Sequence, residues 1–356
     1  WSGLAAPDKV GIVAAPHLLD MLNHLRGTRL LLPPRAEREA RVSTHPDMAD
    51  IRGQSEARMA LEVAASGGHN LLMNGPPGAG KSMLAARLPG ILPNLQAQER
   101  LEISVIESLS SPRGGVRMAS QRPFRAPHHS ASMAALVGGG RYAKPGEISL
   151  AHCGVLFLDE LPEFSRQTLD ALRQPIETGR VEVARAEAHI SYHARFQLIA
   201  AMNPCRCGHA DDANLACHRL PLCRQDYLGK LSGPLLDRFD IRIHVPPVPL
   251  AEMIEDHKGE ASVDIAARVA KAQNRQISRQ GMLNARLDGD RLRELAEPDE
   301  AGQKLLARII EEGQMTARGF NRVLRVARTL ADIKGADGPD VADMASALQW
   351  RGMQVS

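Results

Sequence analysis

The stretch Gly75-Pro-Pro-Gly-Ala-Gly-Lys-Ser82 lies between a short apolar run and a segment with helical spacing. It matches the pattern G-x-x-x-x-G-K-[S/T] in full. Glycines let the backbone curl so that several N–H groups face one anion, and the following helix turns its positive end toward the same place. The sequence therefore predicts a phosphate-binding loop followed by a helix. The expected nucleotide contacts are Gly75, Pro76, Pro77, Gly78, Ala79, Gly80, Lys81, Ser82 and Met83.

Two adjacent carboxylates, Asp159 and Glu160, follow the apolar run Val155-Leu-Phe-Leu158. Acids after a strand are common as solvated turn residues. Together with the phosphate loop upstream, however, they favour a nucleotide-hydrolysing site. We expect Asp159 and Ser82 to hold Mg²⁺ and Glu160 to polarise the attacking water, while Lys81 neutralises the terminal phosphates.

Apolar runs and helical stretches alternate through the first two thirds of the chain. The expected strands lie at residues 70–73, 154–159, 196–201 and 241–245. Alternation of strands and helices predicts an α/β fold with a parallel sheet flanked by helices. Beyond residue 250 only helical patterns remain. We expect an ATPase core over residues 47–248 and a small all-α domain over 249–356.

The composition is that of an ordinary globular protein, with 356 residues, 44% apolar and 24% charged. A net charge of +3 tolerates a nucleic-acid partner without requiring one. The sequence has no run of about 18 apolar residues and no visible signal peptide. Five cysteines in a chain of this length do not indicate a disulfide scaffold. We therefore expect a cytoplasmic protein without a membrane partner.

Three longer stretches carry a family resemblance. They are Arg122-Pro-Phe-Arg-Ala-Pro-His-His129, Leu169-Asp-Ala-Leu-Arg-Gln-Pro175 and Leu231-Ser-Gly-Pro-Leu-Leu-Asp-Arg238. Together with the phosphate loop and the Asp159-Glu160 pair, they resemble the ComM group of the magnesium chelatase-like AAA+ ATPases, over roughly residues 47–335. The resemblance implies a P-loop NTPase AAA+ core with a helix-2 insert (113–147), a pre-sensor 1 hairpin (180–195) and a helical lid. Such relatives carry an N-terminal Lon protease-like domain, so we expect residues 1–46 to be its tail and linker.

The resemblance also implies roles for three further residues. Asn203 matches sensor 1, although an Asn before Pro204 is also a common turn former. Arg238 matches an arginine finger that reaches the ATP of a neighbouring subunit; its alternative is a surface ion pair with Asp237 or Asp240. Arg318 matches the sensor 2 arginine, with Arg325 as the rival assignment. The expected catalytic residues are Lys81, Asp159, Glu160, Asn203, Arg238 and Arg318.

Two inserted segments are candidates for contact with DNA. In residues 180–195, Val181, Val183, Ile190 and Tyr192 alternate with polar residues, which predicts a β-hairpin. Basic residues in a ring's central pore can follow a phosphate backbone without reading its sequence. The alternative is a structural hairpin with mixed surface charge. The DNA-contact candidates are Arg122, Arg125, Lys144 and Arg185.

Four cysteines, Cys205, Cys207, Cys217 and Cys223, lie in the loop 204–224. Four thiolates over so short a span can hold a structural Zn²⁺ in tetrahedral geometry. Their spacing is not that of a standard pair of C-x-x-C motifs, so free reduced thiols are the alternative. His209 and His218 are substitute ligands.

The resemblance implies an ATP- and Mg²⁺-dependent motor that assembles into a ring, expected to be a hexamer. Its expected load is single-stranded or branched DNA, moved by helicase or branch-migration activity during recombination of DNA taken up in natural transformation. Two other functions stay open, namely the motor subunit of a metal chelatase and a protein-remodelling AAA+ ATPase.

Overall fold

A computed structural model describes residues 17–32, 45–110, 118–140, 143–185, 188–208, 217–249, 259–313 and 315–353, with a few isolated positions outside these ranges. Two compact units are distinguished, residues 1–44 with 95–121 and residues 45–94 with 122–356. The first contains α1 (Leu18–Leu25) and α4 (Ala97–Ser110). The second contains the sheet and all other elements. No helix in the described ranges is long and apolar enough to cross a membrane.

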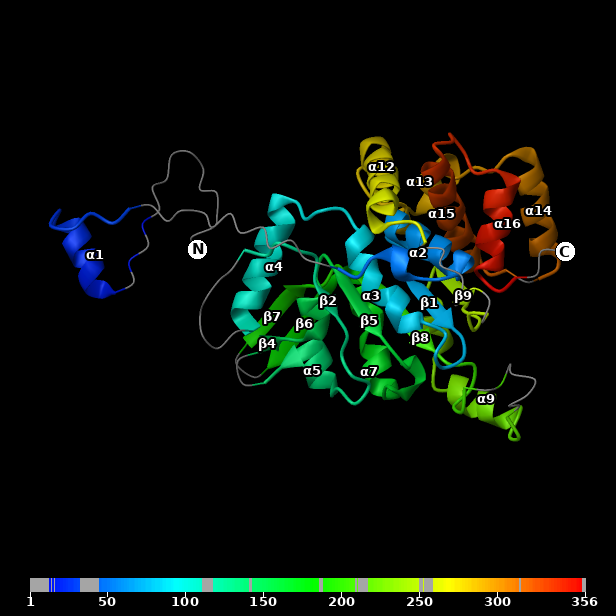
Figure 1. The fold of residues 1–356 in the computed structure, drawn as a ribbon, viewed down its shortest axis with the longest axis horizontal. Coiled ribbons are helices and arrows are strands. Elements are labelled where there is room, and N and C mark those ends of the chain that lie inside the picture. Colours follow the sequence, from blue (N-terminus) through cyan, green and yellow to red (C-terminus); the bar gives the residue numbers. More distant parts are fainter. Residues whose placement is uncertain are drawn as a thin grey trace. The chain divides into compact units, whose positions relative to one another are not determined.

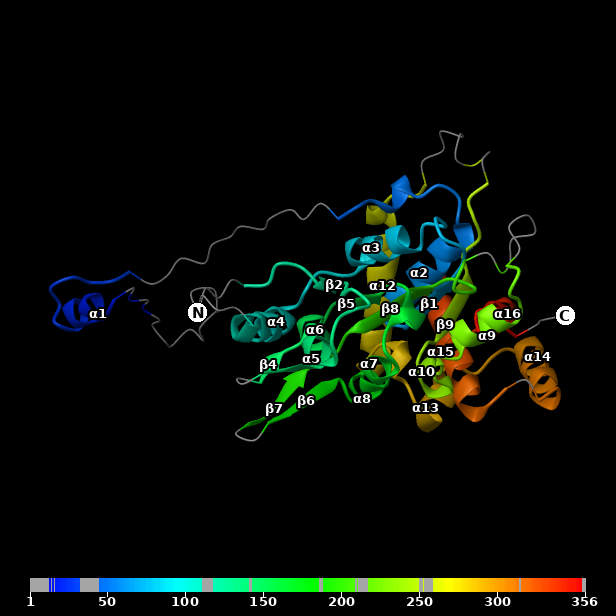
Figure 2. The ribbon, with the colours of Figure 1, turned by 90° about the horizontal axis from the view of Figure 1, so that it is seen from below.

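A five-stranded parallel sheet forms the centre of the second unit (Figures 1 and 2). In spatial order its strands are β2 (Phe124–Arg125), β5 (Val155–Leu158), β8 (Gln197–Met202), β1 (Leu71–Asn74) and β9 (Ile241–His244). This sheet confirms the predicted α/β fold class. Strand β2 was not predicted, and it lies inside the segment 113–147 that we expected to be an insert.

Helices cover both faces of the sheet, because alternate side chains of each strand point to opposite sides. Leu71 and Met73 of β1 enter one buried cluster, while Leu72 between them enters the other. The first face packs on η1 (Met48–Asp50), α2 (Ser55–Gly67) and α3 (Lys81–Ile91). The second packs on α5 (Met133–Val137), α6 (Glu147–Leu150), η2 (Leu161–Glu163), α7 (Arg166–Ala171), α8 (Arg173–Thr178) and α10 (Gly233–Leu236).

The C-terminal helices form the all-α domain and group beside α2 (Figure 1). They are α12 (Ser262–Gln280), η3 (Asn284–Arg286), α13 (Gly289–Leu295), α14 (Glu300–Glu311), α15 (Ala317–Lys334) and α16 (Val341–Gln349). Helical patterns in the sequence at residues 265–275, 302–311, 318–333 and 341–350 predict α12, α14, α15 and α16, whereas the seven-residue α13 was not predicted. A buried hydrogen bond joins His69 Nε2 to Thr329 Oγ1 over 2.8 Å and ties this domain to the sheet.

The predicted hairpin is present, formed by β6 (Arg180–Arg185) and β7 (Ala188–His193). Val181, Val183 and Tyr192 lie in the second core. The Tyr192 hydroxyl donates to Ala143 O over 2.7 Å, next to a smaller hairpin of β3 (Gly138–Gly139) and β4 (Lys144–Pro145). The two hairpins therefore pack together.

Candidate active site

The order of the strands brings Asp159, Asn203 and the phosphate loop together. Parallel strands end at the same edge of a sheet, and β5, β8 and β1 are neighbours. Asp159 follows β5, Asn203 follows β8, and the phosphate loop follows β1. Residues more than 120 positions apart in the chain thus meet at the carboxyl edge of the sheet.

Lys81 is 7% exposed and lies at the centre of this edge. Its ammonium donates to Gly75 O (2.6 Å), Pro76 O (2.8 Å) and Asn203 Oδ1 (3.1 Å). Burial lowers the pKa of Lys81, and the charges of Asp159 and Glu160 oppose that shift. Gly80 adopts φ +85° at the start of α3, a conformation that favours glycine. A Cβ on Gly75 would lie 2.1 Å from Val245 O, so the loop closes against the next strand.

Ser82 and Asp159 form an oxygen-lined pair beside the lysine. The Ser82 hydroxyl donates to Asp159 Oδ2 over 2.6 Å, and the Glu160 backbone N–H donates to Asp159 Oδ1 over 2.9 Å. Hydroxyl and carboxylate oxygens are the donors that Mg²⁺ prefers, so these residues fit the ion that the sequence predicts. Glu160 has φ +51°, an uncommon value for a residue with a Cβ.

His129 is a neighbour of Glu160 that sequence reasoning did not assign. Its Nδ1 lies 3.2 Å from Glu160 Oε2. It ends the stretch Arg122–His129 that carries the family resemblance, and this was the one signal that marked it in advance.

The loop before α2 packs against the phosphate loop. The Gln54 side-chain amide donates to Pro246 O (2.6 Å) and to Ala79 O (3.4 Å). Arg87 of α3 pairs with Asp50 at 3.2 Å. These bonds connect residues 50–54 to the loop that would hold the phosphates.

Arg238 lies at the opposite edge of the sheet. It precedes β9, whereas Lys81 follows the parallel strand β1. Arg238 lines an open pocket of about 550 Å³ that Arg318, Arg322 and Arg325 also line. Its guanidinium donates to Pro234 O over 2.9 Å and pairs with Glu177. Strands of four residues separate the two edges by about 13 Å, so Arg238 lies far from the phosphate loop of its own chain.

The two sensor 2 candidates differ in what holds them. Arg318 is exposed and, within the ranges that the structure describes, forms no hydrogen bond or ion pair. Arg325 Nε donates to Leu287 O over 2.5 Å, and its guanidinium pairs with Asp288. Burial lowers the pKa of Arg325. The free guanidinium is the one that best suits an external phosphate.

The neighbouring Arg322 pairs with the buried Asp240. Burial alone would raise the pKa of Asp240, but the His69 ring, whose Nδ1 lies 3.6 Å from Asp240 Oδ2, and the charge of Arg322 hold it well below its usual range. The ion pair between Arg322 and Asp240 thus lines the same pocket as Arg238 and Arg318.

The four DNA-contact candidates do not share one environment. Arg122 donates to Pro93 O and Cys153 O, both at 2.7 Å, and Arg125 forms a two-point pair with Glu147 at 2.6 and 2.7 Å. Lys144 is exposed on β4. The backbone of Arg185 ends β6, but its side chain lies outside the described structure.

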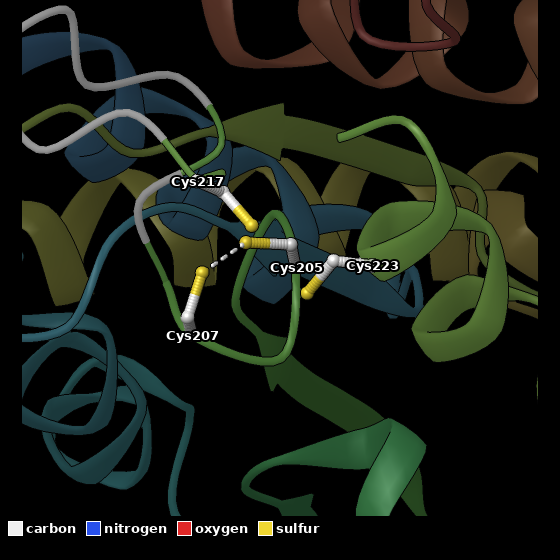
Figure 3. A group of neighbouring side chains, drawn as sticks. All are labelled: Cys205, Cys207, Cys217 and Cys223. Carbon is white, nitrogen blue, oxygen red and sulfur yellow. Dashed lines mark hydrogen bonds between the residues drawn. The ribbon is translucent and has the colours of Figure 1, made fainter. Parts of the chain in front are cut away.

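The sulfurs of the four cysteines turn toward a common centre (Figure 3). The Sγ atoms of Cys205, Cys207, Cys217 and Cys223 all lie within 4.8 Å of one another, and those of Cys205 and Cys207 are 3.1 Å apart. Thiolates around one zinc ion are about 3.8 Å apart, since each Zn–S bond is about 2.3 Å. The set therefore fits Zn²⁺. His218 is not a member of this group, and His209 lies outside the described residues.

Comparison with known proteins gives consistent matches. The family model of magnesium chelatase, subunit ChlI, matches residues 47–253, and that of the C-terminal part of the same subunit matches 259–351. YifB of Salmonella typhimurium is 45% identical over 96% of this chain and 68% of its own length. Competence protein ComM of Haemophilus influenzae is 43% identical over 95% of this chain and 67% of its own. The magnesium-chelatase 38 kDa subunit of Rhodobacter capsulatus is 25% identical over 80% of this chain and 81% of its own.

Proposed function

Because this chain belongs to the magnesium chelatase subunit ChlI family of AAA+ ATPases, we propose that it is an ATP-driven, ring-forming DNA motor of the ComM kind. The observation that carries the proposal is the separation of Lys81 and Arg238 to opposite edges of one sheet. A complete hydrolytic site then needs two copies of the chain. Each copy supplies the phosphate loop of one site and the arginines of the next.

The residues at the carboxyl edge have distinct chemical tasks. Lys81 would neutralise charge on the terminal phosphates, and Asn203, which contacts Lys81, would orient the attacking water. Glu160 would accept that water's proton. Ser82 and Asp159 would hold Mg²⁺, which supplies further neutralisation of phosphate charge.

Arg238 and Arg318 would act on the nucleotide of a neighbouring subunit. Both line one open pocket, and neither lies at its own chain's phosphate loop. An arginine supplied from another subunit stabilises charge that develops in the transition state and raises turnover by about 10³-fold or more. A closed ring, expected to be a hexamer, gives every site this arrangement.

DNA is the proposed load because the relative named as a competence protein is 43% identical, whereas the magnesium-chelatase subunit is 25% identical. Lys144, and Arg185 on the adjoining hairpin, are the proposed contacts. Arg122 and Arg125 have protein partners that favour a structural role. The metal-chelatase motor is the second candidate, favoured by the family match itself. Recombination of incoming DNA is the proposed setting of the activity.

We further propose that Cys205, Cys207, Cys217 and Cys223 hold a structural zinc ion. The inward orientation of all four sulfurs supports it (Figure 3). Zinc held by four thiolates has no open position, so it would contribute stability rather than chemistry.

The test is ATP hydrolysis with and without single-stranded and forked DNA, with Lys81→Ala as the blank. We expect DNA to stimulate hydrolysis, and the double change Lys144→Ala and Arg185→Ala to reduce that stimulation. Lys230→Ala is the control, because this lysine is half-exposed and pairs with Glu163 away from both hairpins. Robust ATP hydrolysis that no DNA alters would contradict the proposed DNA motor and favour the metal-chelatase motor.

A further inference from the structure

The four-cysteine loop lies directly against the phosphate loop. Gly208, the residue after Cys207, has φ +85°, and a Cβ there would lie 2.5 Å from Pro77 Cδ and 2.6 Å from Pro77 Cγ. Only a bare backbone fits this contact. Pro76, the residue before Pro77, supplies a carbonyl oxygen that accepts from Lys81 at 2.8 Å. A shift of the cysteine loop would therefore move an oxygen that positions the catalytic lysine.

A second connection runs along the chain. Cys205 is completely buried and comes two residues after Asn203, whose Oδ1 accepts from Lys81 at 3.1 Å. The backbone N–H of Gly208 donates to Cys205 O over 3.0 Å and closes a tight turn that carries two of the four thiols. The turn thus touches the ATP site at both of its ends.

The third connection runs through α9 (Leu222–Leu228), which carries Cys223. One turn later on this helix, the side chain of Tyr227 is 3% exposed and lies close to the backbone of Asn203. Arg224 Nε donates to Pro204 O over 3.4 Å. Whatever holds Cys223 to the turn also holds α9 to the backbone beside Asn203.

We propose that the four-cysteine loop is a metal-dependent brace on the nucleotide site. Zn²⁺ bound by the four thiolates fixes the turn 204–208 against α9. This turn then holds Pro77 and Asn203 in the positions that nucleotide binding requires. The inference rests on the zinc and the nucleotide site proposed above. It adds that occupancy of the metal site controls affinity for nucleotide, although no cysteine reaches the phosphates.

The experiment measures zinc content by atomic absorption and the Kd for mant-ADP by fluorescence, with far-UV circular dichroism to verify folding. The wild-type chain is compared before and after treatment with a zinc-selective chelator, with excess Mg²⁺ in all samples. Cys207→Ser removes a ligand, whereas Gly208→Ala keeps all four cysteines and places a Cβ against Pro77. Cys153→Ser is the cysteine control. Gly281→Ala controls for backbone strain, because Gly281 has φ +77° and nothing within 4 Å of an added Cβ.

We expect about one zinc per wild-type chain, and about tenfold weaker mant-ADP binding after zinc removal or in Cys207→Ser. Added ZnCl₂ should restore the stripped wild type but not the variant. Gly208→Ala should keep its zinc and still bind mant-ADP about tenfold more weakly, unlike Gly281→Ala.

Three results would overturn the brace, each distinguishable from the others. If the zinc-loaded and the stripped wild type bind mant-ADP with equal affinity, zinc stabilises only its own loop and has no influence on nucleotide binding. A wild type that takes up no zinc from ZnCl₂ would refute the metal site. A zinc-loaded wild type that binds no mant-ADP would refute the nucleotide site itself.

Discussion

His129 Nδ1 lies 3.2 Å from Glu160 Oε2, so the carboxylate proposed as the general base has an imidazole for a partner. The two residues follow different strands, His129 after β2 and Glu160 after β5, and β2 and β5 are paired in parallel. At this distance the imidazole covers one side of the carboxylate, where the attacking water would otherwise bind. The contact therefore restrains Glu160.

Replacement of His129 by alanine should release Glu160. We expect DNA-independent ATP hydrolysis to rise about two- to fivefold. His128→Ala is the matched control, because the centroid of the His128 ring lies 4.1 Å from that of His129 but its Nδ1 contacts Ser130 instead. If hydrolysis falls in His129→Ala and not in the control, then the imidazole positions Glu160 rather than restraining it.

Lys81→Ala and Arg238→Ala should each abolish hydrolysis, yet a mixture of the two should recover part of it. In a mixed ring, an Arg238→Ala copy with an intact phosphate loop can lie beside a Lys81→Ala copy with an intact arginine. About one quarter of the interfaces in a randomly mixed ring would be of this kind. The measurement is ATPase activity against mixing ratio after subunit exchange. No recovery at any ratio would argue that both residues serve the same chain's nucleotide.

Substitution of the two sensor 2 candidates, Arg318 and Arg325, should affect different properties of the protein. Arg318→Ala should lower kcat about 10²-fold without loss of stability, because the exposed guanidinium has no partner among the described residues. Arg325→Ala should lower stability by about 1–2 kcal/mol, because it leaves the Leu287 carbonyl and Asp288 without their donor. Urea unfolding and steady-state kinetics on both variants decide between them, and the reverse pattern would make Arg325 the sensor.

Asp332 should be a main determinant of the stability of the helical domain. Its buried carboxylate accepts from Arg279 (2.6 and 3.0 Å), Arg328 (2.6 Å) and Asn284 (2.8 Å). Asp332→Asn should lower the free energy of unfolding by about 3 kcal/mol at pH 7. Asp337→Asn is the control, because this carboxylate is fully exposed and pairs with Arg275 at 3.4 Å, so we expect no measurable change in stability.

The cost of Asp332→Asn should depend on pH. Burial alone would raise the pKa of Asp332, but its bonds to Arg279 and Arg328 lower it below the ordinary value of 3.8. A carboxyl group whose pKa is depressed in the folded state stabilises the fold above its unfolded pKa, and this stabilisation is lost as the pH falls through the folded value. The difference between wild type and variant should thus be constant above about pH 4 and shrink below it. A difference that grows on acidification would contradict this assignment.

The sequence by itself determined the local chemistry of this protein. The phosphate loop, the Asp159-Glu160 pair, the alternation of the hairpin and the long lid helices are all written in contiguous residues, because glycine conformation and side-chain periodicity act over a few positions. Strand β2 escaped prediction because two residues, Phe124 and Arg125, carry no periodicity.

Only the tertiary structure decided which distant residues meet. Because the strands are parallel, Lys81 and Arg238 lie at opposite edges of the sheet. Packing also gives Arg122 and Arg125 hydrogen-bond partners within the protein, which their charges alone did not predict. It also places Gly208 against Pro77 and His129 beside Glu160. These contacts join segments far apart in the chain, and their geometry follows from how the sheet and its helices pack rather than from any local pattern.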